Sequence, residues 1–110
     1  MMKPLLSVAA SGLLRAILAR TGVDRDRILI CDWTSVDWQS LTFVGERHEA
    51  TFRVTGPDAA RLVAMVADGL EDAEFAIPGQ IVADIALAEP PVSQPDGSIL
   101  IAIEALTVGE

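Results

Sequence analysis

The stretch over residues 49–70, EATFRVTGPDAARLVAMVADGL, decides how the rest of the chain is arranged. It opens on alternating apolar and polar residues, the period of a strand with one buried face, and its apolar members are Ala50, Phe52 and Val54. Pro57 and Asp58 then end the strand and begin a helix, because proline suits the first helical position and an acid suits the positive end of the helix dipole.

The second half of the stretch predicts an amphipathic helix that ends at a glycine. Gly69 followed by Leu70 is typical of a left-handed C-cap with its hydrophobic contact. Apolar residues recur before it at steps of three and four, and so line one face: Ala59, Leu62, Val63, Val66, Ala67 and Leu70. Strand, turn and helix are therefore specified locally, whereas nothing here is a catalytic motif.

The composition predicts one acidic domain. A chain of 110 residues suffices for a single two-layer core, so we expect one domain over residues 1–110. Sixteen acidic residues against eight basic ones give a net charge of −8, and we therefore expect no sequence-specific nucleic-acid partner. The single cysteine favours a reducing cytoplasm. Arg15 and Arg20 interrupt the N-terminal apolar run, which argues against a secretory signal or a membrane partner.

Reading outward from residues 49–70 predicts the order α-β-β-α-β-β. The expected elements outside that stretch are a helix over residues 4–21, a strand over 28–36, a loop over 37–45, and strands over 80–89 and 98–108. Strands joined by hairpins are antiparallel. The fold class is therefore α+β, with a four-stranded, mainly antiparallel sheet and two helices packed on one face. We expect its core to hold Leu14, Phe52, Leu62, Val66, Ile85 and Ile101.

Two features predict contacts with a partner. The last two strands are apolar on both faces, so the second face of the sheet needs a cover. The loop over residues 37–45 holds two of the five aromatic residues, and it either folds over the core edge as a hairpin loop or docks on a neighbouring subunit. On the docking interpretation, the interface residues are Trp33, Trp38, Leu41, Phe43, Leu100 and Leu106.

The sequence offers little reactive chemistry. His48, between charged neighbours at a strand start, is expected to be solvated or ion-paired, and Cys31, in an apolar strand, is expected to be a buried small hydrophobe. No histidine or cysteine lies at metal-ligand spacing, and no phosphate-binding loop is present. The carboxylates are interpreted as a solvated acidic rim: Glu71, Asp72, Glu74, Asp84 and Glu104. We therefore expect no enzyme, no catalytic or metal residues and no cofactor.

Several short segments resemble one known family. They are the Trp38 segment, Gly45-Glu46-Arg47-His48-Glu49 before the strand, the helix start Asp58-Ala59-Ala60-Arg61, the Pro95-Asp96-Gly97 turn and the closing Ala105-Leu106-Thr107. Together with the element order, they resemble the tail-terminator, or tail-completion, proteins of long-tailed phages, prophages and gene-transfer agents. The resemblance covers the chain from about Ile28 to the C-terminus.

The resemblance implies a structural virion-assembly protein rather than an enzyme. It implies a homo-oligomeric ring, expected to be a hexamer, that ends the tail tube and contacts the head connector. The implied partners are copies of the chain itself, the tail-tube protein and the head-connector protein. The implied location is the cytoplasm during assembly and then the tail of the virion or particle. The alternatives are a small ligand-binding or regulatory α+β domain of the ferredoxin-like kind, and a small enzyme.

Overall fold

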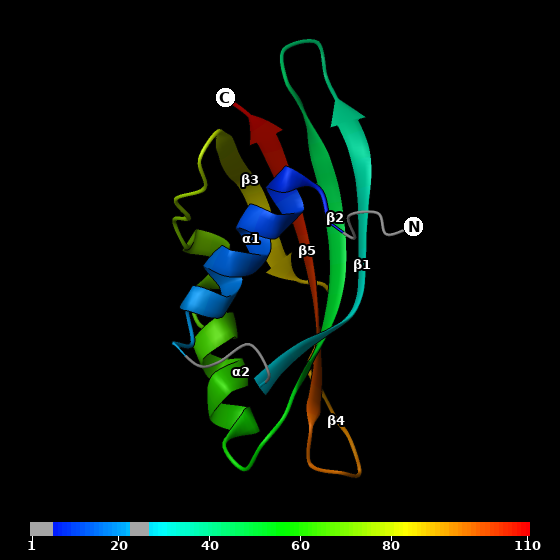
Figure 1. Cartoon of the computed structure of the whole chain (residues 1–110), viewed down its shortest axis with the longest axis vertical. Helices are drawn as coiled ribbons and strands as arrows, with labels where there is room; N and C mark the ends of the chain where they lie inside the picture. The colour runs from blue at the N-terminus through cyan, green and yellow to red at the C-terminus, as the bar shows by residue number, and fades with distance from the viewer. Residues whose placement is uncertain (1–5, 23–26) are drawn as a thin grey trace, which may run out of the picture.

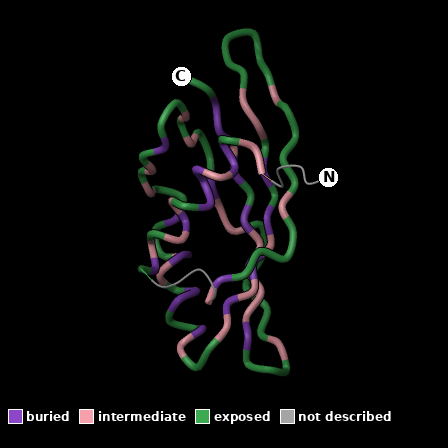
Figure 2. Tube along the Cα trace, viewed as in Figure 1, coloured by how far each residue is buried: buried purple, intermediate pink, exposed green. Residues whose placement is uncertain are grey.

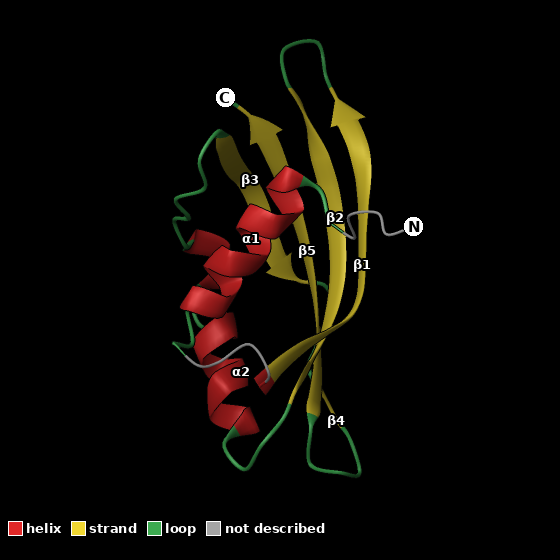
Figure 3. Ribbon diagram, viewed as in Figure 1, coloured by secondary structure: helices red, strands yellow, loops and turns green. Residues whose placement is uncertain are grey.

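The central stretch forms a strand, a turn and a helix in the computed structural model, which describes residues 6–22 and 27–110. Both helices lie on the same side of one sheet, so the predicted α+β class is confirmed (Figure 3). The elements in chain order (Figure 1) are α1 (Val8–Ala19), β1 (Ile28–Gln39), β2 (Val44–Val54), α2 (Ala59–Ala67), the short 3-10 helix η2 (Leu70–Asp72), β3 (Gln80–Leu87), β4 (Val92–Ser93) and β5 (Ile99–Gly109).

The sheet is antiparallel and has five strands instead of the predicted four. Its order is β1-β2-β5-β3, and β4 pairs with β5 beyond the end of β3. Pro90 and Pro91 cause the difference, because a proline has no N–H to donate and the last ladder bond before them runs from the Ala88 N–H to the Ala102 carbonyl at 2.8 Å. Pairing with β5 resumes at Val92. The fifth strand is thus an interrupted continuation of β3.

The topology places the β1–β2 hairpin at the margin of the sheet. Both β2 and β3 are antiparallel to β5, so β2 and β3 run parallel to each other with β5 between them. The connection from β2 to β3 passes through α2, which makes a split β-α-β unit. Among the described strands, β1 pairs with β2 alone, and the tip of their hairpin extends past the end of β5 (Figure 1).

The core lies between the helices and one face of the sheet (Figure 2). Phe52, Leu62 and Val66 are 0% exposed, and all six predicted core residues belong to the same buried cluster. Alternation selects this face, since Ala50, Phe52 and Val54 are all buried. Gly69 has the predicted left-handed conformation, at φ 64°, and the following Leu70 is buried. The predicted strand, turn and helix over residues 49–70 are therefore confirmed, although the helix begins at Ala59 rather than at Pro57 and its C-cap is Asp68.

The predicted loop over residues 37–45 is wrong at both ends. Strand pairing continues to Gln39 opposite Val44, so the loop contains only residues 40–43. Its turn is held by the Ser40 N–H, which donates to the Phe43 carbonyl at 2.9 Å, and by the Ser40 hydroxyl, which accepts from the Phe43 N–H at 3.0 Å. β1 and β2 extend into the predicted loop because they pair with each other there. The alternation of apolar and polar residues within one strand does not reveal such pairing.

The first helix is shorter than predicted. α1 begins at Val8, and the Ser7 hydroxyl caps it by accepting from the Ala10 N–H at 3.1 Å. The predicted opening residue, Pro4, lies outside the described residues. Gly12 leaves room for the side chain of Ile77, because a Cβ added at Gly12 would lie 2.6 Å from Cγ2 of Ile77.

Candidate interaction surface

The tip of the β1–β2 hairpin exposes apolar side chains. Leu41 is fully exposed, Phe43 is 48% exposed and Val44 is 68% exposed. The tip lies beyond the helix layer and beyond the end of β5, so the core does not use these side chains (Figure 1). Aromatic and aliphatic groups at such a tip gain most by entering a pocket on another molecule.

Trp38 joins the tip to the outer face of the sheet, the face turned away from the helices. It is half-buried and stands outside the core cluster. With Val36 and Arg47 it lines a hollow of about 230 Å³. Leu106 pairs with Arg47 in the register between β2 and β5 and is also half-buried. Trp38, Val36 and Leu106 therefore place apolar side chains around Arg47 on the outer face, next to the hairpin tip.

A glycine opposite Trp38 brings β2 and β5 close together at this point. Gly45 pairs with Trp38 on one side and with Val108 on the other. A Cβ on Gly45 would lie 1.9 Å from the carbonyl oxygen of Thr107. Only a residue without a side chain fits between these strands, and the base of the tip is thereby tied to β5.

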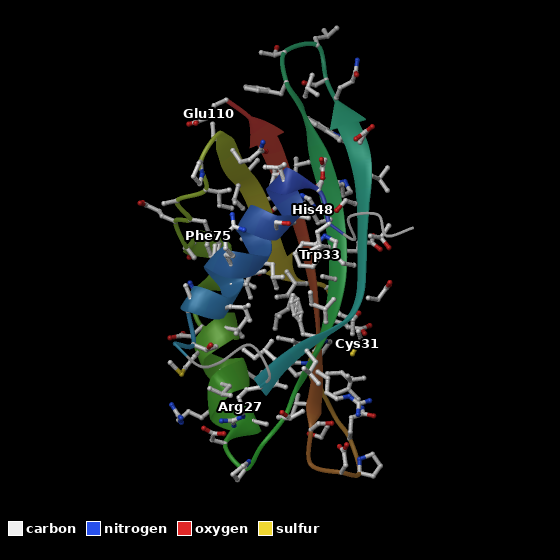
Figure 4. The ribbon with its side chains drawn as sticks, in the orientation of Figure 1. Arg27, Cys31, Trp33, His48, Phe75 and Glu110 are labelled. Carbon is white, nitrogen blue, oxygen red and sulfur yellow. The ribbon has the colours of Figure 1, made fainter. Side chains whose placement is uncertain are left out.

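The remaining predicted interface residues lie elsewhere. Leu100 is on the outer face but pairs with Arg53, near the end of β5 that is remote from the tip. Trp33 faces the helices: its ring centroid lies 5.9 Å from that of Phe52 and 6.0 Å from that of His48 (Figure 4). The structure thus brings Trp38, Leu41, Phe43 and Leu106 to one end of the molecule and separates Trp33 and Leu100 from them.

His48 is buried rather than solvated, which corrects the expectation from the sequence. It is 1% exposed, and its ring lies between two hydroxyls, with Nδ1 2.8 Å from Ser35 Oγ and Nε2 2.9 Å from Thr107 Oγ1. Trp33 Nε1 can only donate, and it donates to Ser35 Oγ at 3.0 Å; the Ser35 hydroxyl keeps its own hydrogen, and the network is complete when that hydrogen is donated to Nδ1. Nε2 then carries the hydrogen and donates to Thr107, whose hydroxyl donates to the Glu46 carbonyl at 3.5 Å.

This chain of hydrogen bonds satisfies a neutral imidazole. Burial lowers the pKa of His48, and the nearby Glu46 carboxylate opposes that shift only in part. The network joins β1, β2 and β5 beneath the start of α1, where the Ser7 hydroxyl also donates to Glu46 Oε1 at 2.6 Å. The sequence contained a signal for this burial: His48 lies two residues before Ala50 in the alternating pattern, so it is on the same strand face as Ala50, Phe52 and Val54.

Cys31 is exposed rather than buried, which is a second correction. The register moves from Ile30 opposite Phe52 to Asp32 opposite Thr51, so Cys31 occupies a bulge with no partner residue. A bulge turns side chains away from the face that alternation predicts. The thiol therefore lies on the surface of an edge strand.

The carboxylates lie on the surface, as predicted. Asp84 and Glu104 are exposed on the outer face of the sheet, and Glu49 stands directly opposite Glu104. Within residues 6–22 and 27–110, no group of three or more potential ligands is placed to hold a metal ion. No helix in the same part of the chain is long and apolar enough to cross a membrane.

Comparison with known proteins does not identify the chain: no protein-family model matches it, and no curated protein matches it.

Proposed function

We propose that the chain is a structural subunit of the tail of a long-tailed phage or related gene-transfer agent, and that it forms a ring that ends the tail tube and contacts the head connector. The observation that carries the proposal is the apolar hairpin tip, with Leu41, Phe43 and Val44 exposed beyond the core. The resemblance of the sequence to tail-terminator proteins supplies the identity of the partners.

A ring needs two different surfaces on each subunit, because head-to-tail contacts close a ring only when a projection on one copy meets another surface on the next. The hairpin tip supplies a projection, and Trp38 with Leu106 supplies an adjoining half-buried area on the outer face. A hexamer is the expected closure. The acidic chain suits a ring through which DNA passes, because it does not neutralise phosphates.

The packing between the layers favours this proposal over a ligand-binding domain. A small ligand between helices and sheet would need a cavity there, yet Phe52, Leu62 and Val66 are 0% exposed and pack together in that space. The split β-α-β topology is common to many functions and does not favour either interpretation.

The test is the Trp38→Ala variant, with assembly and thermal unfolding measured side by side. Assembly is followed by light scattering at high concentration and by the length of tubes formed when the cognate tail-tube protein polymerises in the presence of the chain. Loss of an interface anchor costs about 2–4 kcal/mol, so the variant should fail to assemble or cap while its melting temperature stays unchanged.

Val92→Ala is the matched control, because Val92 is a 48% exposed apolar residue in β4, outside the hairpin. It should assemble and cap like the original chain. A large fall in melting temperature with assembly intact in Trp38→Ala makes Trp38 a core residue. A chain that stays monomeric at high concentration and does not bind its tube protein overturns the proposal.

A further inference from the structure

Within residues 6–22 and 27–110, no strand pairs with the outer edge of β1. Of the strands that the structure describes, only β2 pairs with β1, so the other edge of this 12-residue strand offers its N–H and C=O groups to a partner. Natural edge strands are usually kept short, bulged or charged, or carry proline; β1 is long and contains no lysine or proline, although it carries Asp32 and Asp37. Its one interruption is the bulge at Cys31.

An open groove of about 720 Å³ runs beside this edge, between β1 and the start of α1. Leu6, Val8 and Trp33 give it apolar walls, and Val8 is 83% exposed although it belongs to a helix. Thr34 and Ser35, which belong to the edge strand β1, line the groove as well. A groove between a helix and a free strand edge has the geometry in which extended peptides add to a sheet as a further strand.

The groove is acidic at one end. Asp37 and Glu46 both line it and stand directly opposite each other in the register of β1 and β2. Like charges in directly opposed positions destabilise a sheet. In the described part of the chain, neither carboxylate forms a salt bridge, since the three ion pairs there involve Asp58 and Asp96. A cationic side chain placed between them offsets that repulsion.

The charge pattern argues against a second copy as the occupant. In the order of the described strands, the opposite edge of the sheet is β3, whose sequence QIVADIAL contains an aspartate and no base. β1 itself contains two aspartates and no base. Neither strand brings a cation to Asp37 and Glu46, so pairing of β1 with a described sheet edge of a second copy does not complement the groove.

We propose that the groove binds an extended segment of a different protein, which adds as a strand along β1, places apolar side chains against Leu6, Val8 and Trp33, and places a lysine or arginine between Asp37 and Glu46. This inference goes beyond the proposed ring and does not depend on it, because it concerns another surface and another partner.

The probe is a short capped peptide that alternates lysine and valine, labelled with fluorescein and titrated with the full chain by fluorescence anisotropy. A second peptide alternates glutamate and valine, and a third is the lysine peptide with alternate backbone nitrogens methylated. The lysine peptide should bind and the glutamate peptide should not. Methylation removes the strand-to-strand hydrogen bonds and should weaken binding roughly tenfold or more.

Asp37→Asn and Asp72→Asn form the matched pair, because each removes one exposed carboxylate and Asp72 lies on η2. Asp37→Asn should weaken binding of the lysine peptide about two- to fivefold, the size of one exposed ion pair, and Asp72→Asn should change it less. Amide hydrogen exchange should show new protection in β1 between Trp33 and Asp37 when the peptide binds.

Three results overturn the proposal. Equal weakening by Asp37→Asn and Asp72→Asn shows a general charge effect without a site. Undiminished binding of the methylated peptide shows that no strand is added. Protection of β1 that rises with protein concentration and resists competition by the peptide shows that the occupant is a second copy.

Discussion

Two phenylalanines of the β1–β2 hairpin should respond in opposite ways to the same truncation. Phe52 is 0% exposed, faces the helices and lies 5.9 Å, centroid to centroid, from Trp33. Phe52→Ala removes a whole ring from a close-packed site and should lower the free energy of unfolding by about 3–5 kcal/mol. Phe43 is 48% exposed at the tip, and Phe43→Ala should change that free energy by about 0.5 kcal/mol or less.

Urea unfolding followed by tryptophan fluorescence measures both variants, because Trp33 lies against Phe52 and reports on the core. For a chain of this size, 3–5 kcal/mol corresponds to a fall in melting temperature of roughly 12–20 °C. Phe52→Leu, which keeps much of the volume, should lose less than Phe52→Ala and remains measurable if the alanine variant does not fold.

The functional readout should show the reverse order. Phe43→Ala should impair assembly of the oligomeric ring or capping of the tube, although the variant should remain as stable as the original chain. The reason is that the exposed phenyl group of Phe43 is available to a partner. Equal stability losses in the two alanine variants, or a loss below about 1 kcal/mol for Phe52→Ala, would mean that the strand register and the assignment of faces are wrong.

Two further predictions concern the base of the hairpin and its pH dependence. Gly45→Ala should cost about 1–3 kcal/mol of stability, because its Cβ would meet the Thr107 carbonyl at 1.9 Å, whereas Gly109→Ala, whose Cβ would lie 3.6 Å from the Val44 carbonyl, should be nearly neutral in the same unfolding assay. Acidification below about pH 6.5 should lower the free energy of unfolding, because burial lowers the pKa of His48 in the folded state and the unfolded chain then binds the proton more readily. His48→Gln should flatten that part of a pH titration of stability and leave the loss below about pH 3.8, where the lowered pKa of Asp58 makes the separate contribution; an unchanged profile above pH 5 would contradict the assignment.

The sequence predicted those elements whose causes are local. Alternation identified the buried face of β2 and placed Phe52 in the core, and Gly69 has the expected left-handed conformation just after α2. It failed where pairing between strands decides the outcome. Cys31 is exposed because β1 bulges against β2, and the pairing of Trp38 with Gly45 extends both strands into a predicted loop.

The error at His48 had a different origin. The charged residues around His48 suggested a solvated strand start, yet the alternation along the strand already placed His48 on the same face as Phe52. What alternation does not reveal is whether a buried imidazole has partners, and here those partners come from two other strands, Ser35 of β1 and Thr107 of β5. The same alternation separates two of the predicted interface residues. Trp33 and Trp38 are five positions apart on one strand, so they face opposite sides of the sheet.

The topology explains how the hairpin can serve an interaction without weakening the fold. The split β-α-β unit closes around β5, since β2 and β3 flank it and α2 covers it. β1 and the tip lie outside that unit, and Leu41 and Phe43 are absent from the core cluster. Substitutions at the tip should therefore leave the packing of the core unchanged. The Gly45 contact with β5 and the His48 network secure the base of the hairpin, so that the tip is held at a fixed position relative to the sheet.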